Sequence, residues 1–425
     1  MKSFLLLLGS LLLAHLFADA QQSCASYQYL QQEIRNNPAL ADRIAKQESA
    51  INIINREVLS DASDGSGSGL LPVVKIPVVV HVVYRTDDQN ISDDQIRSQI
   101  AILNREFRLN HADTSKIPFA FRALAADCRI EFALASISPQ GYISNGITRK
   151  KTGNYSFGFD DKIKFTSSGG EDAWDSDKYL NIWVANLTSG VNGYSSVYGG
   201  PKEKDGIVIR FDGFGDRGNV KAPYNKGRLA IHELGHWMGL KHIWGDTYCG
   251  SDGIDDTPKQ QNPTRNCPTT FISSCDNAAV SIMYNNYMDL TSDECMNMFT
   301  MGQREKMRNS FVEGGAHHLL ASSNAAVALG LPEPEKPLEA PATKSFLAYP
   351  NPVANILNLD IKDQSLAGKT ITVHNHLGQQ VMLVNISKTT TSINLQGLRD
   401  GVYYLRAGKG TTPVKVVKSS GTANL

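Results

Sequence analysis

The spacing of hydrophobic residues changes several times along this chain of 425 residues, and each change marks a new segment. An apolar run from Leu5 to Phe17 follows Lys2 and precedes Ala18–Ala20, the order of a secretory signal with cleavage before Gln21. The run is too short to span a bilayer. We therefore expect residues 1–20 to be a signal peptide, with a retained amphipathic anchor as the alternative.

Polar residues dominate the next segment, 21–60, in which apolar residues such as Ile44 and Ile51 stand among charges. This pattern predicts polar helices. The run Asp61–Gly69, DASDGSGSG, has the composition of a flexible chain. We expect 61–72 to be a linker that a protease can reach, because exposed small and polar residues are preferred sites of cleavage.

A folded domain is expected from residue 73 to residue 330. The run VVKIPVVVHVVY, 73–84, is rich in β-branched residues and predicts a strand buried on both faces. Apolar residues then recur at helical spacing after the candidate N-cap Ser92, at Ile96, Ile100, Leu103 and Phe107. Further strands are expected at 129–136, 179–187 and 205–212. A strand, a helix and then more strands indicate an α/β or α+β domain.

The last part of the chain differs again. Prolines and acidic residues in LPEPEKPLEAPAT make 331–344 an extended linker. From 345 to 425, short strand-like runs alternate with turn residues. This alternation predicts a small all-β sandwich.

Composition and charge narrow the class of protein. Hydrophobic residues make up 41% of the chain and charged residues 20%, which is typical of globular proteins. Lysine plus arginine equals aspartate plus glutamate at 42 each, so no basic field favours nucleic acid as a partner. No other apolar stretch reaches the roughly 18 residues of a transmembrane helix. We expect a soluble protein with no transmembrane segment and no nucleic-acid partner.

The stretch HELGHWMGLKH, His232–His242, carries the clearest chemistry. His232 and His236 are four residues apart, so a helix places them on one face. Gly239 can adopt the left-handed conformation that ends a helix, and the turn can bring His242 back as a third ligand. Three neutral imidazoles leave one tetrahedral position on Zn²⁺ open for water. Because the motif fixes five positions, chance occurrence in an ordinary helix is the weaker interpretation.

Glu233 lies beside the first histidine and can take a proton from a water whose pKa the ion lowers to roughly 7. It can then pass the proton to the leaving amine of a peptide bond. A zinc endopeptidase is therefore the leading hypothesis, although the motif also fits hydrolysis of other amides. Met288, in NNYMDL, can pack beneath the metal, with core filling as its alternative role.

These residues resemble the metzincin metalloproteases and, within them, the pappalysin family with its ulilysin-like members. The resemblance rests on HELGHWMGLKHIWGD, on DDTP, and on NYMDL followed by CMNMFTMGQ, and it extends over residues 73–315. It implies an α+β catalytic domain with two sub-domains around a substrate cleft. A mixed sheet and the active-site helix form one sub-domain, and the other carries the third histidine and a methionine turn.

The resemblance also assigns roles to residues. The matched positions are His232, His236 and His242 as zinc ligands, Glu233 as general base and Met288 as the methionine of the turn. In an oxidising compartment the crowded cysteines suggest disulfides, and spacing alone leaves three pairings open. The resemblance implies bonds from Cys249 to Cys275 and from Cys267 to Cys295.

Two further sites are implied by the resemblance. A calcium site would have oxygen ligands from Asp252, Asp256 and Thr257, with a solvated acidic turn as the alternative. Glu294 matches an acidic residue at the base of the pocket for the residue after the scissile bond. A carboxylate there predicts cleavage before arginine or lysine. An exposed acidic side chain is the alternative.

The chain departs from the family pattern at Leu290, where the family usually has a tyrosine. A donor that supports the tetrahedral intermediate is then missing, unless Tyr287 or another group replaces it. This departure supports an alternative function, a binding or adhesion protein of the cell surface that keeps the zinc fold with weak or no turnover. The intact Glu233 argues against that alternative.

Cys24 lies in the polar segment before the first linker. A thiolate there can occupy the open position on zinc and keep a zymogen latent until the segment is removed. Some pappalysins resemble this arrangement. A cut before Arg56 would suit self-activation by an enzyme that prefers arginine. The alternatives for Cys24 are a disulfide with Cys128 or an idle thiol.

The tail resembles a second known family. FLAYPNPVANILNLDI and GLRDGVYYLRA are similar to the C-terminal sorting domain of type IX secretion cargo. The resemblance implies the type IX machinery as a partner, export through the periplasm of a gram-negative bacterium, and loss of the tail. The alternative is a sandwich that binds carbohydrate or packs on the catalytic domain.

Overall fold

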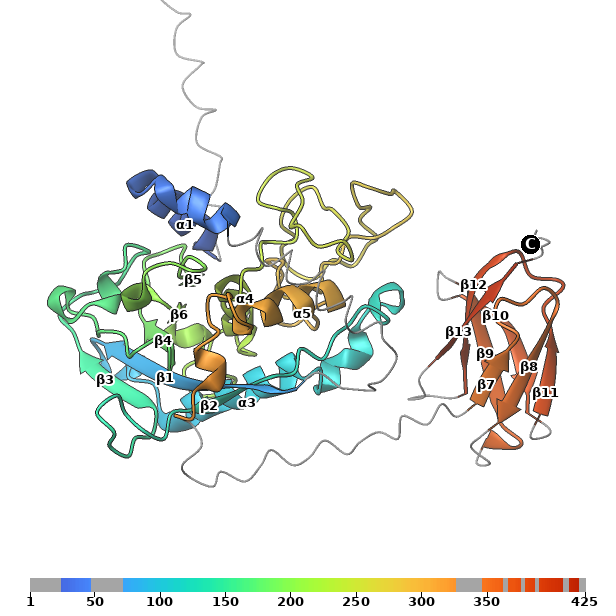
Figure 1. Cartoon of the computed structure of the whole chain (residues 1–425), viewed down its shortest axis with the longest axis horizontal. Coiled ribbons are helices and arrows are strands. Elements are labelled where there is room, and N and C mark those ends of the chain that lie inside the picture. Colours follow the sequence, from blue (N-terminus) through green and yellow to red (C-terminus); the bar gives the residue numbers. More distant parts are fainter. Residues whose placement is uncertain are drawn as a thin grey trace, which may run out of the picture. The chain divides into compact units, whose positions relative to one another are not determined.

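The computed structural model describes residues 24–46, 72–325, 346–361, 366–375, 379–386, 390–407 and 413–419. The chain divides into two compact units, and each is described by itself (Figure 1). The larger unit comprises Met1–Ile117 with Leu124–Gly330, and the smaller comprises Pro118–Ala123 with Leu331–Leu425. The expected signal peptide, most of the Gly/Ser linker and the proline-rich linker lie outside the described residues.

A mixed sheet forms the centre of the larger unit. Its strands are β1 (Val74–Tyr84), β2 (Ile130–Leu134), β3 (Ile147–Lys151), β4 (Leu180–Ala185), β5 (Gly193–Ser195) and β6 (Ile207–Arg210). The strand order is β2-β1-β4-β6-β5, and β3 pairs with the second half of β1. All pairs are parallel except β5 with β6. β5 is therefore an antiparallel edge strand, and its outer side can accept another segment of chain.

β1 is buried on both faces, as its β-branched sequence predicts. Ile76 and Val78 belong to the main core, which also contains residues of the helices that cover one face of the sheet. Val83 belongs to a second cluster, together with Trp183 of β4. The sheet thus separates two apolar layers, because successive side chains of a strand point to opposite faces.

Two helices contribute to the main core. α3 (Asp93–Phe107) begins at the predicted N-cap Ser92, whose hydroxyl accepts a hydrogen bond of 3.1 Å from Gln95 N. Its four apolar residues at helical spacing lie in this core, as predicted. α4 (Arg228–Trp237) contacts α3, β5 and β6. The HELGH stretch is therefore held next to the edge of the sheet.

The described N-terminal residues lie on the second apolar layer. α1 (Ser26–Asn36) contacts β5, and the two are neighbours in Figure 1. Tyr29 packs in the same cluster as Trp183. The described part of the predicted polar segment, 24–46, is thus largely helical, and residues 47–60 lie outside the description.

Between α4 and α5 (Met301–Arg308) the chain forms turns and isolated bridges. Two disulfides cross this segment, Cys249–Cys275 and Cys267–Cys295, which is the pairing that the resemblance implies. Short 3-10 helices link other elements of the chain, at Asp87–Gln89, Ala112–Lys116, Phe119–Phe121, Lys162–Lys164, Thr166–Ser168, Lys202–Lys204, Phe211–Gly213, Asn309–Phe311 and Leu320–Ser322.

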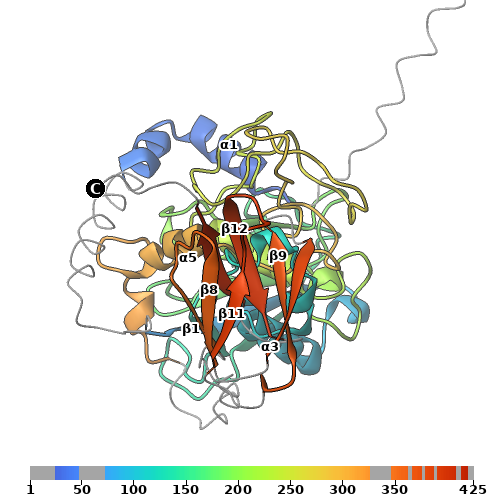
Figure 2. The same cartoon turned by 90° about the vertical axis from the view of Figure 1, so that its right-hand side faces the viewer.

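From residue 346 onwards the smaller unit is all-β, as predicted (Figure 2). Its strands are β7 (Phe346–Tyr349), β8 (Ile356–Ile361), β9 (Thr370–Asn375), β10 (Gln380–Asn385), β11 (Thr390–Asn394), β12 (Gly401–Arg406) and β13 (Val414–Lys418). They form two antiparallel sheets, ordered β10-β9-β12-β13 and β11-β8-β7, around one apolar core. Among the described residues of the whole chain, no helix is long and apolar enough to cross a membrane.

Candidate metal centre and active site

Three histidines converge at the end of α4. His232 and His236 stand one helical turn apart, and Gly239, with a φ of 88°, turns the chain so that His242 returns to them. Nε2 of His236 lies 3.1 Å from Nε2 of His232 and 3.1 Å from Nε2 of His242. The structure thus brings the three predicted ligand nitrogens together.

The other ring nitrogen of each histidine is held by an oxygen atom. The oxygens that face Nδ1 of His232, His236 and His242 are, in that order, Tyr287 O at 2.6 Å, Leu240 O at 2.9 Å and Asp246 Oδ1 at 2.5 Å. Because these oxygens accept, each Nδ1 carries the proton and each Nε2 presents a lone pair. Asp246, four residues after His242, is a site residue that the sequence analysis did not single out.

Three lone pairs at this spacing repel one another unless a cation lies between them. A tetrahedral zinc ion with bonds of roughly 2.0–2.1 Å requires nitrogens about 3.3 Å apart, which is close to the spacing here. Burial lowers the pKa of His232 and of His242 to about 3, and it lowers the pKa of His236 as well. The imidazoles are therefore neutral, the form that binds a metal, and the site fits zinc.

Glu233 is fully buried beside the histidines. Its Oε2 accepts a hydrogen bond of 2.7 Å from Ser26 Oγ, and Cys24 Sγ lies 3.6 Å from the same oxygen. Among the described residues, Oε1 has no hydrogen-bond partner. Burial is the main reason that the pKa of Glu233 rises to about 8. A carboxyl group with this pKa can take up and release a proton near neutral pH.

Cys24 approaches the same point from the N-terminal segment. Its Sγ and one ring nitrogen of each histidine all lie within 4.8 Å of one another. Cys24 forms a parallel bridge with Gly193 of β5, and Ala25 N donates a hydrogen bond of 3.0 Å to Gly193 O. The N-terminal segment therefore covers the open edge of the sheet. Cys24 and the buried Cys128 are both free, so the alternative disulfide does not form.

Met288 packs directly against α4. Any side chain at Gly235 would collide with Met288 Sδ, so the helix requires glycine at that position. Met288 O accepts a hydrogen bond of 3.2 Å from Ile243 N, and the preceding carbonyl, Tyr287 O, holds His232. The turn around Met288 thus positions the ring of His232 as well as supporting the helix.

The hydroxyl of Tyr287 does not replace the tyrosine that is missing at Leu290. It is buried and donates to the carboxylate of Glu106. Leu290 lines a small cavity beside His232, and Tyr224 lines the same cavity. Tyr224 is therefore a phenol close to the metal site that the sequence analysis missed, because no motif includes it.

The buried carboxylate of this region belongs to Asp293, whereas Glu294 is exposed. Asp293 lines the cavity beside His232. Its Oδ2 accepts hydrogen bonds from Lys226 N at 2.8 Å and Arg228 N at 3.2 Å, at the start of α4. Oδ1 has no hydrogen-bond partner among the described residues. The buried acid thus stands one residue earlier than expected, because the side chain that caps α4 is that of Asp293.

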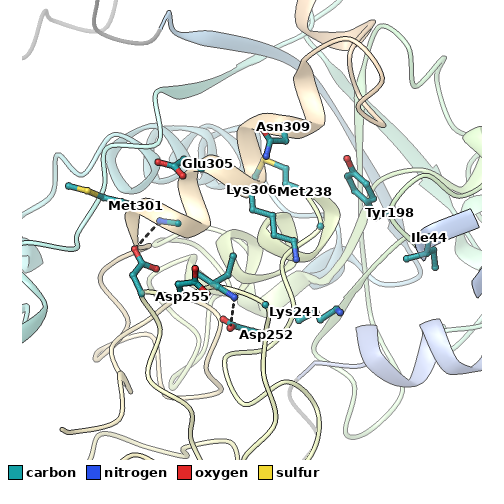
Figure 3. Close-up of a pocket in the computed structure, with 15 residues that line it drawn as sticks. Ile44, Tyr198, Met238, Lys241, Asp252, Asp255, Met301, Glu305, Lys306 and Asn309 are labelled. Atoms are coloured by element: carbon teal, nitrogen blue, oxygen red, sulfur yellow. Dashed lines mark hydrogen bonds between the residues drawn. The ribbon is translucent and has the colours of Figure 1, made fainter. Parts of the chain in front are cut away.

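The three expected calcium ligands do not all meet. Thr257 Oγ1 lies 2.9 Å from both carboxylate oxygens of Asp252. The carboxylate of Asp256 instead accepts hydrogen bonds from Thr300 Oγ1 at 2.6 Å and Gly302 N at 2.9 Å, at the start of α5. Figure 3 shows Asp252 in the wall of a pocket of about 570 Å³. Only Asp252 and Thr257 of the expected set therefore lie together.

Comparisons with known proteins find metallopeptidases and a secretion domain. Residues 165–312 match the peptidase M43 family, described as pregnancy-associated plasma protein-A, and residues 347–419 match the secretion system C-terminal sorting domain. An extracellular metalloprotease of Arthroderma gypseum is 28% identical over an alignment of 287 residues, and the alignment covers 64% of this chain and 86% of that protein.

Two solved structures of Tannerella forsythia proteins are also similar. Mature mirolysin in complex with a cleaved peptide is 44% identical, with a TM-score of 0.59, and the match covers 60% of this chain and 98% of that one. A promirolysin mutant is 41% identical, with a TM-score of 0.64, and the match covers 71% of this chain and 98% of that one. The likeness to promirolysin thus extends over more of this chain than the likeness to the mature form.

Proposed function

We propose, because this chain belongs to the pappalysin family of zinc metalloendopeptidases, that it is a secreted peptidase made as a zymogen and that Glu233 is its general base. The observation that carries the proposal is the convergence of three neutral histidines and a buried glutamate at one point. The sorting domain at 347–419 and the extracellular relatives agree with export.

Glu233 would take a proton from the water that attacks the peptide carbonyl carbon. It would then give this proton to the amine nitrogen as the C–N bond breaks. Zinc, held by His232, His236 and His242, would lower the pKa of the water and polarise the carbonyl. Both oxygens of Glu233 are available for this work once Ser26 has left, because Oε1 has no partner among the described residues.

Cut-site mapping tests this proposal. The full-length protein is allowed to mature, the mature enzyme is incubated with a denatured proteome, and the new N-termini are sequenced. Zinc-loaded Glu233→Ala protein is the matched control. New termini that appear only with the wild-type protein would support the peptidase. An absence of new termini, from wild-type protein that holds zinc, would exclude it and favour a binding function for the zinc fold.

The N-terminal segment is proposed to keep the enzyme latent. Cys24 would be the fourth zinc ligand and would take the position of the attacking water. Ser26 donates a hydrogen bond to Glu233 Oε2, so this oxygen could not accept a proton from a water. The greater coverage by promirolysin supports a segment that the mature enzyme lacks. Activation would then require a cut that separates Cys24 and Ser26 from the catalytic domain, either in the Gly/Ser linker or before Arg56.

The enzyme is proposed to cleave before arginine or lysine. Asp293 supports this preference, because a cationic side chain in the cavity beside His232 would meet its unpaired Oδ1. In the cut-site map, Asp293→Asn should remove the preference, and the matched change Glu294→Gln should retain it. If Glu294→Gln removed the preference and Asp293→Asn retained it, Glu294 would be the residue that selects the basic side chain. Termini without any basic preference would exclude a cationic pocket.

A structural calcium ion is proposed at Asp252 and Thr257, whose oxygens suit a hard cation. Added CaCl₂ should raise the melting temperature of the wild-type protein and should have little effect on Asp252→Asn. The matched change Asp256→Asn weakens the cap of α5 and should leave the response to calcium intact. Equal melting temperatures of the wild-type protein with and without calcium would exclude the site.

The sorting domain is proposed to pass the chain to the type IX secretion machinery. A chain that lacks residues 345–425 should then accumulate in the periplasm of a bacterium that has this machinery. Immunoblots of periplasm and culture medium measure the distribution. Equal secretion of the shortened and complete chains would exclude this role of the tail.

A further inference from the structure

Tyr29 of α1 fills a space between Asp161, Lys164 and Tyr194 of residues 72–325, the catalytic unit, and we call this space the pocket. The side chain of Tyr29 is buried, and its hydroxyl donates a hydrogen bond of 2.7 Å to Asp161 Oδ2. The ring centroid lies 5.2 Å from that of Tyr194 and 5.3 Å from Nζ of Lys164. N-terminal segment and catalytic unit thus meet at a second point, which involves neither the histidines nor Glu233.

The wall of this pocket is charged and buried. Lys164 is fully buried, and its Nζ lies 2.9 Å from Asp161 Oδ1 and donates a hydrogen bond of 2.8 Å to Lys204 O. The same Nζ lies 5.0 Å from the ring centroid of Tyr194 and 5.5 Å from that of Trp183. Burial acts to raise the pKa of Asp161, but Lys164, the hydrogen bond from Tyr29 and Lys204 together lower it, so the carboxylate is ionised.

None of these wall residues belongs to the N-terminal segment. When α1 leaves, the pocket keeps an ionised carboxylate, an ammonium group and an aromatic wall. A phenol matches all three, because its hydroxyl donates to the carboxylate, its face meets the cation and its ring packs on the aromatic wall. A phenyl ring matches only the last two and leaves Asp161 without that hydrogen bond.

The position of the pocket relates it to peptide binding. Tyr194 lies in β5, and the N-terminal segment runs along the outer side of this strand. Gly193 O accepts a hydrogen bond from Ala25 N, and Ser195 N donates a hydrogen bond of 2.9 Å to Ser26 Oγ. These two backbone groups of β5 lose their partners when the segment leaves. An extended peptide can then add to the same edge by main-chain hydrogen bonds.

We propose that the mature enzyme carries a phenol-binding subsite, formed by Asp161, Lys164 and Tyr194, which takes a tyrosine side chain of a bound peptide. The inference rests on the proposed removal of the N-terminal segment, because Tyr29 fills the subsite until that step. Tyr29 therefore occupies the subsite in the zymogen, and a tyrosine of the substrate takes its place in the mature enzyme.

A binding experiment tests the recognition of the phenol. The receptor is zinc-loaded Glu233→Gln protein, whose N-terminal segment is removed by limited proteolysis in the Gly/Ser linker. The ligand is a synthetic peptide of residues 24–46 with Cys24→Ser, and calorimetry measures its dissociation constant. Tyr29→Phe in the peptide should raise this constant about ten-fold or more, because a buried hydrogen bond to a charged group is lost.

The matched control peptide carries Tyr27→Phe, the same chemical change on the same helix, and should bind within about two-fold of the parent. Equal dissociation constants for the parent and Tyr29→Phe peptides would overturn the inference. Because the receptor is inactive and is processed by an added protease, this measurement does not depend on the activity of the enzyme.

The cut-site map of the wild-type enzyme supplies the second readout. Tyrosine should be enriched over phenylalanine at one fixed distance from the scissile bond, and Asp161→Asn should abolish this difference. A map that records cleavage but shows no such position would overturn the inference. Binding that depends on Tyr29, in a protein that cleaves nothing, would retain the recognition of the phenol and overturn the peptidase itself.

Discussion

The hydroxyl of Ser26 donates a hydrogen bond of 2.7 Å to Oε2 of Glu233, 207 positions further along the chain. The same Oγ accepts a hydrogen bond from Ser195 N, so one small side chain joins the N-terminal segment to the edge strand and to the carboxylate of Glu233. An oxygen that already accepts this bond is not available to a water. The proposed latency therefore depends on Ser26 as well as on Cys24.

Removal of either residue should release activity before the chain is cut. Cys24→Ala should give premature activity, because it frees a position at the metal site. Ser26→Ala should raise the activity of the intact zymogen about ten-fold, since a hydrogen bond to a charged group contributes roughly 1.5–3 kcal/mol. Initial rates on a quenched peptide measure both effects, with mass spectrometry to verify an intact chain.

The control for this pair is Arg35→Ala, at the exposed end of α1. It should remain as inactive as the wild-type zymogen. If Cys24→Ala and Ser26→Ala were both equally inactive, these two contacts would not be the cause of latency.

Glu233→Gln should lower kcat of the activated enzyme by roughly 10²–10⁴-fold, the usual contribution of a general base. The amide has nearly the same shape but cannot take up the proton. Zinc content, measured by mass spectrometry of the metal, should be unchanged. Glu203→Gln, a matched change at an exposed position, should retain full kcat. A Glu233→Gln enzyme with wild-type kcat would assign the proton transfer to another group.

Chelation of zinc should lower both activity and the melting temperature. Removal leaves three lone pairs facing one another at the ends of His232, His236 and His242. An ion present at about 1,000 times its dissociation constant stabilises the folded state by about 4 kcal/mol. Scanning calorimetry with and without 1,10-phenanthroline measures the shift, and added zinc should reverse it. His242→Ala should show little shift, whereas an unchanged wild-type melting temperature would contradict a bound metal.

His81 in β1 should make the stability of the catalytic unit depend on pH. Its Nδ1 lies 2.8 Å from Thr148 Oγ1 and its Nε2 lies 3.0 Å from Asn181 Oδ1, and burial lowers its pKa to about 4. In the unfolded chain the pKa is roughly 6.5, so the unfolded state binds the proton more readily. The contribution of His81 is complete above about pH 6.5 and falls by roughly 3 kcal/mol as the pH drops to 4.

Urea unfolding at a series of pH values between about 7 and 4 measures this dependence. His81→Gln should unfold at lower urea concentrations and lose less stability as the pH falls, because glutamine does not titrate. His318→Gln, at an exposed histidine, should follow the wild-type curve. Parallel curves for His81→Gln and the wild-type protein would show that another group causes the loss in acid.

Local spacing explains why the metal centre could be predicted. His232, His236 and Gly239 lie within one helix and the turn that ends it, so a period of 3.6 residues and one left-handed glycine determine their arrangement. β1 and α3 also followed from periodicity. β3 (ITRKK) is mostly polar and β5 (GYS) has only three residues, so neither pattern indicates a strand. β3 forms because it pairs with the distant β1, and β5 forms because it pairs with the nearby β6.

The contacts of the N-terminal segment could not be predicted in this way. Ser26 meets Glu233 and Tyr29 meets Asp161 across 207 and 132 positions, and a single serine or tyrosine forms no pattern. The choice between Asp293 and Glu294 also depends on which side chain a turn directs towards the start of α4. The sequence shows only that the two acidic residues are adjacent. Asp293 is the buried one because its carboxylate accepts hydrogen bonds from the backbone at the start of α4.

The two disulfides impose an order on maturation. They fasten the segment between α4 and α5, which has little regular structure of its own and contains Met288 and Asp293. Disulfides persist in oxidising compartments and are rare in the cytosol. The cross-links of the segment that contains Met288 and Asp293 therefore form only after the chain has left the cytosol. In newly made protein, still in the cytosol, this part of the chain is thus held by packing and hydrogen bonds alone.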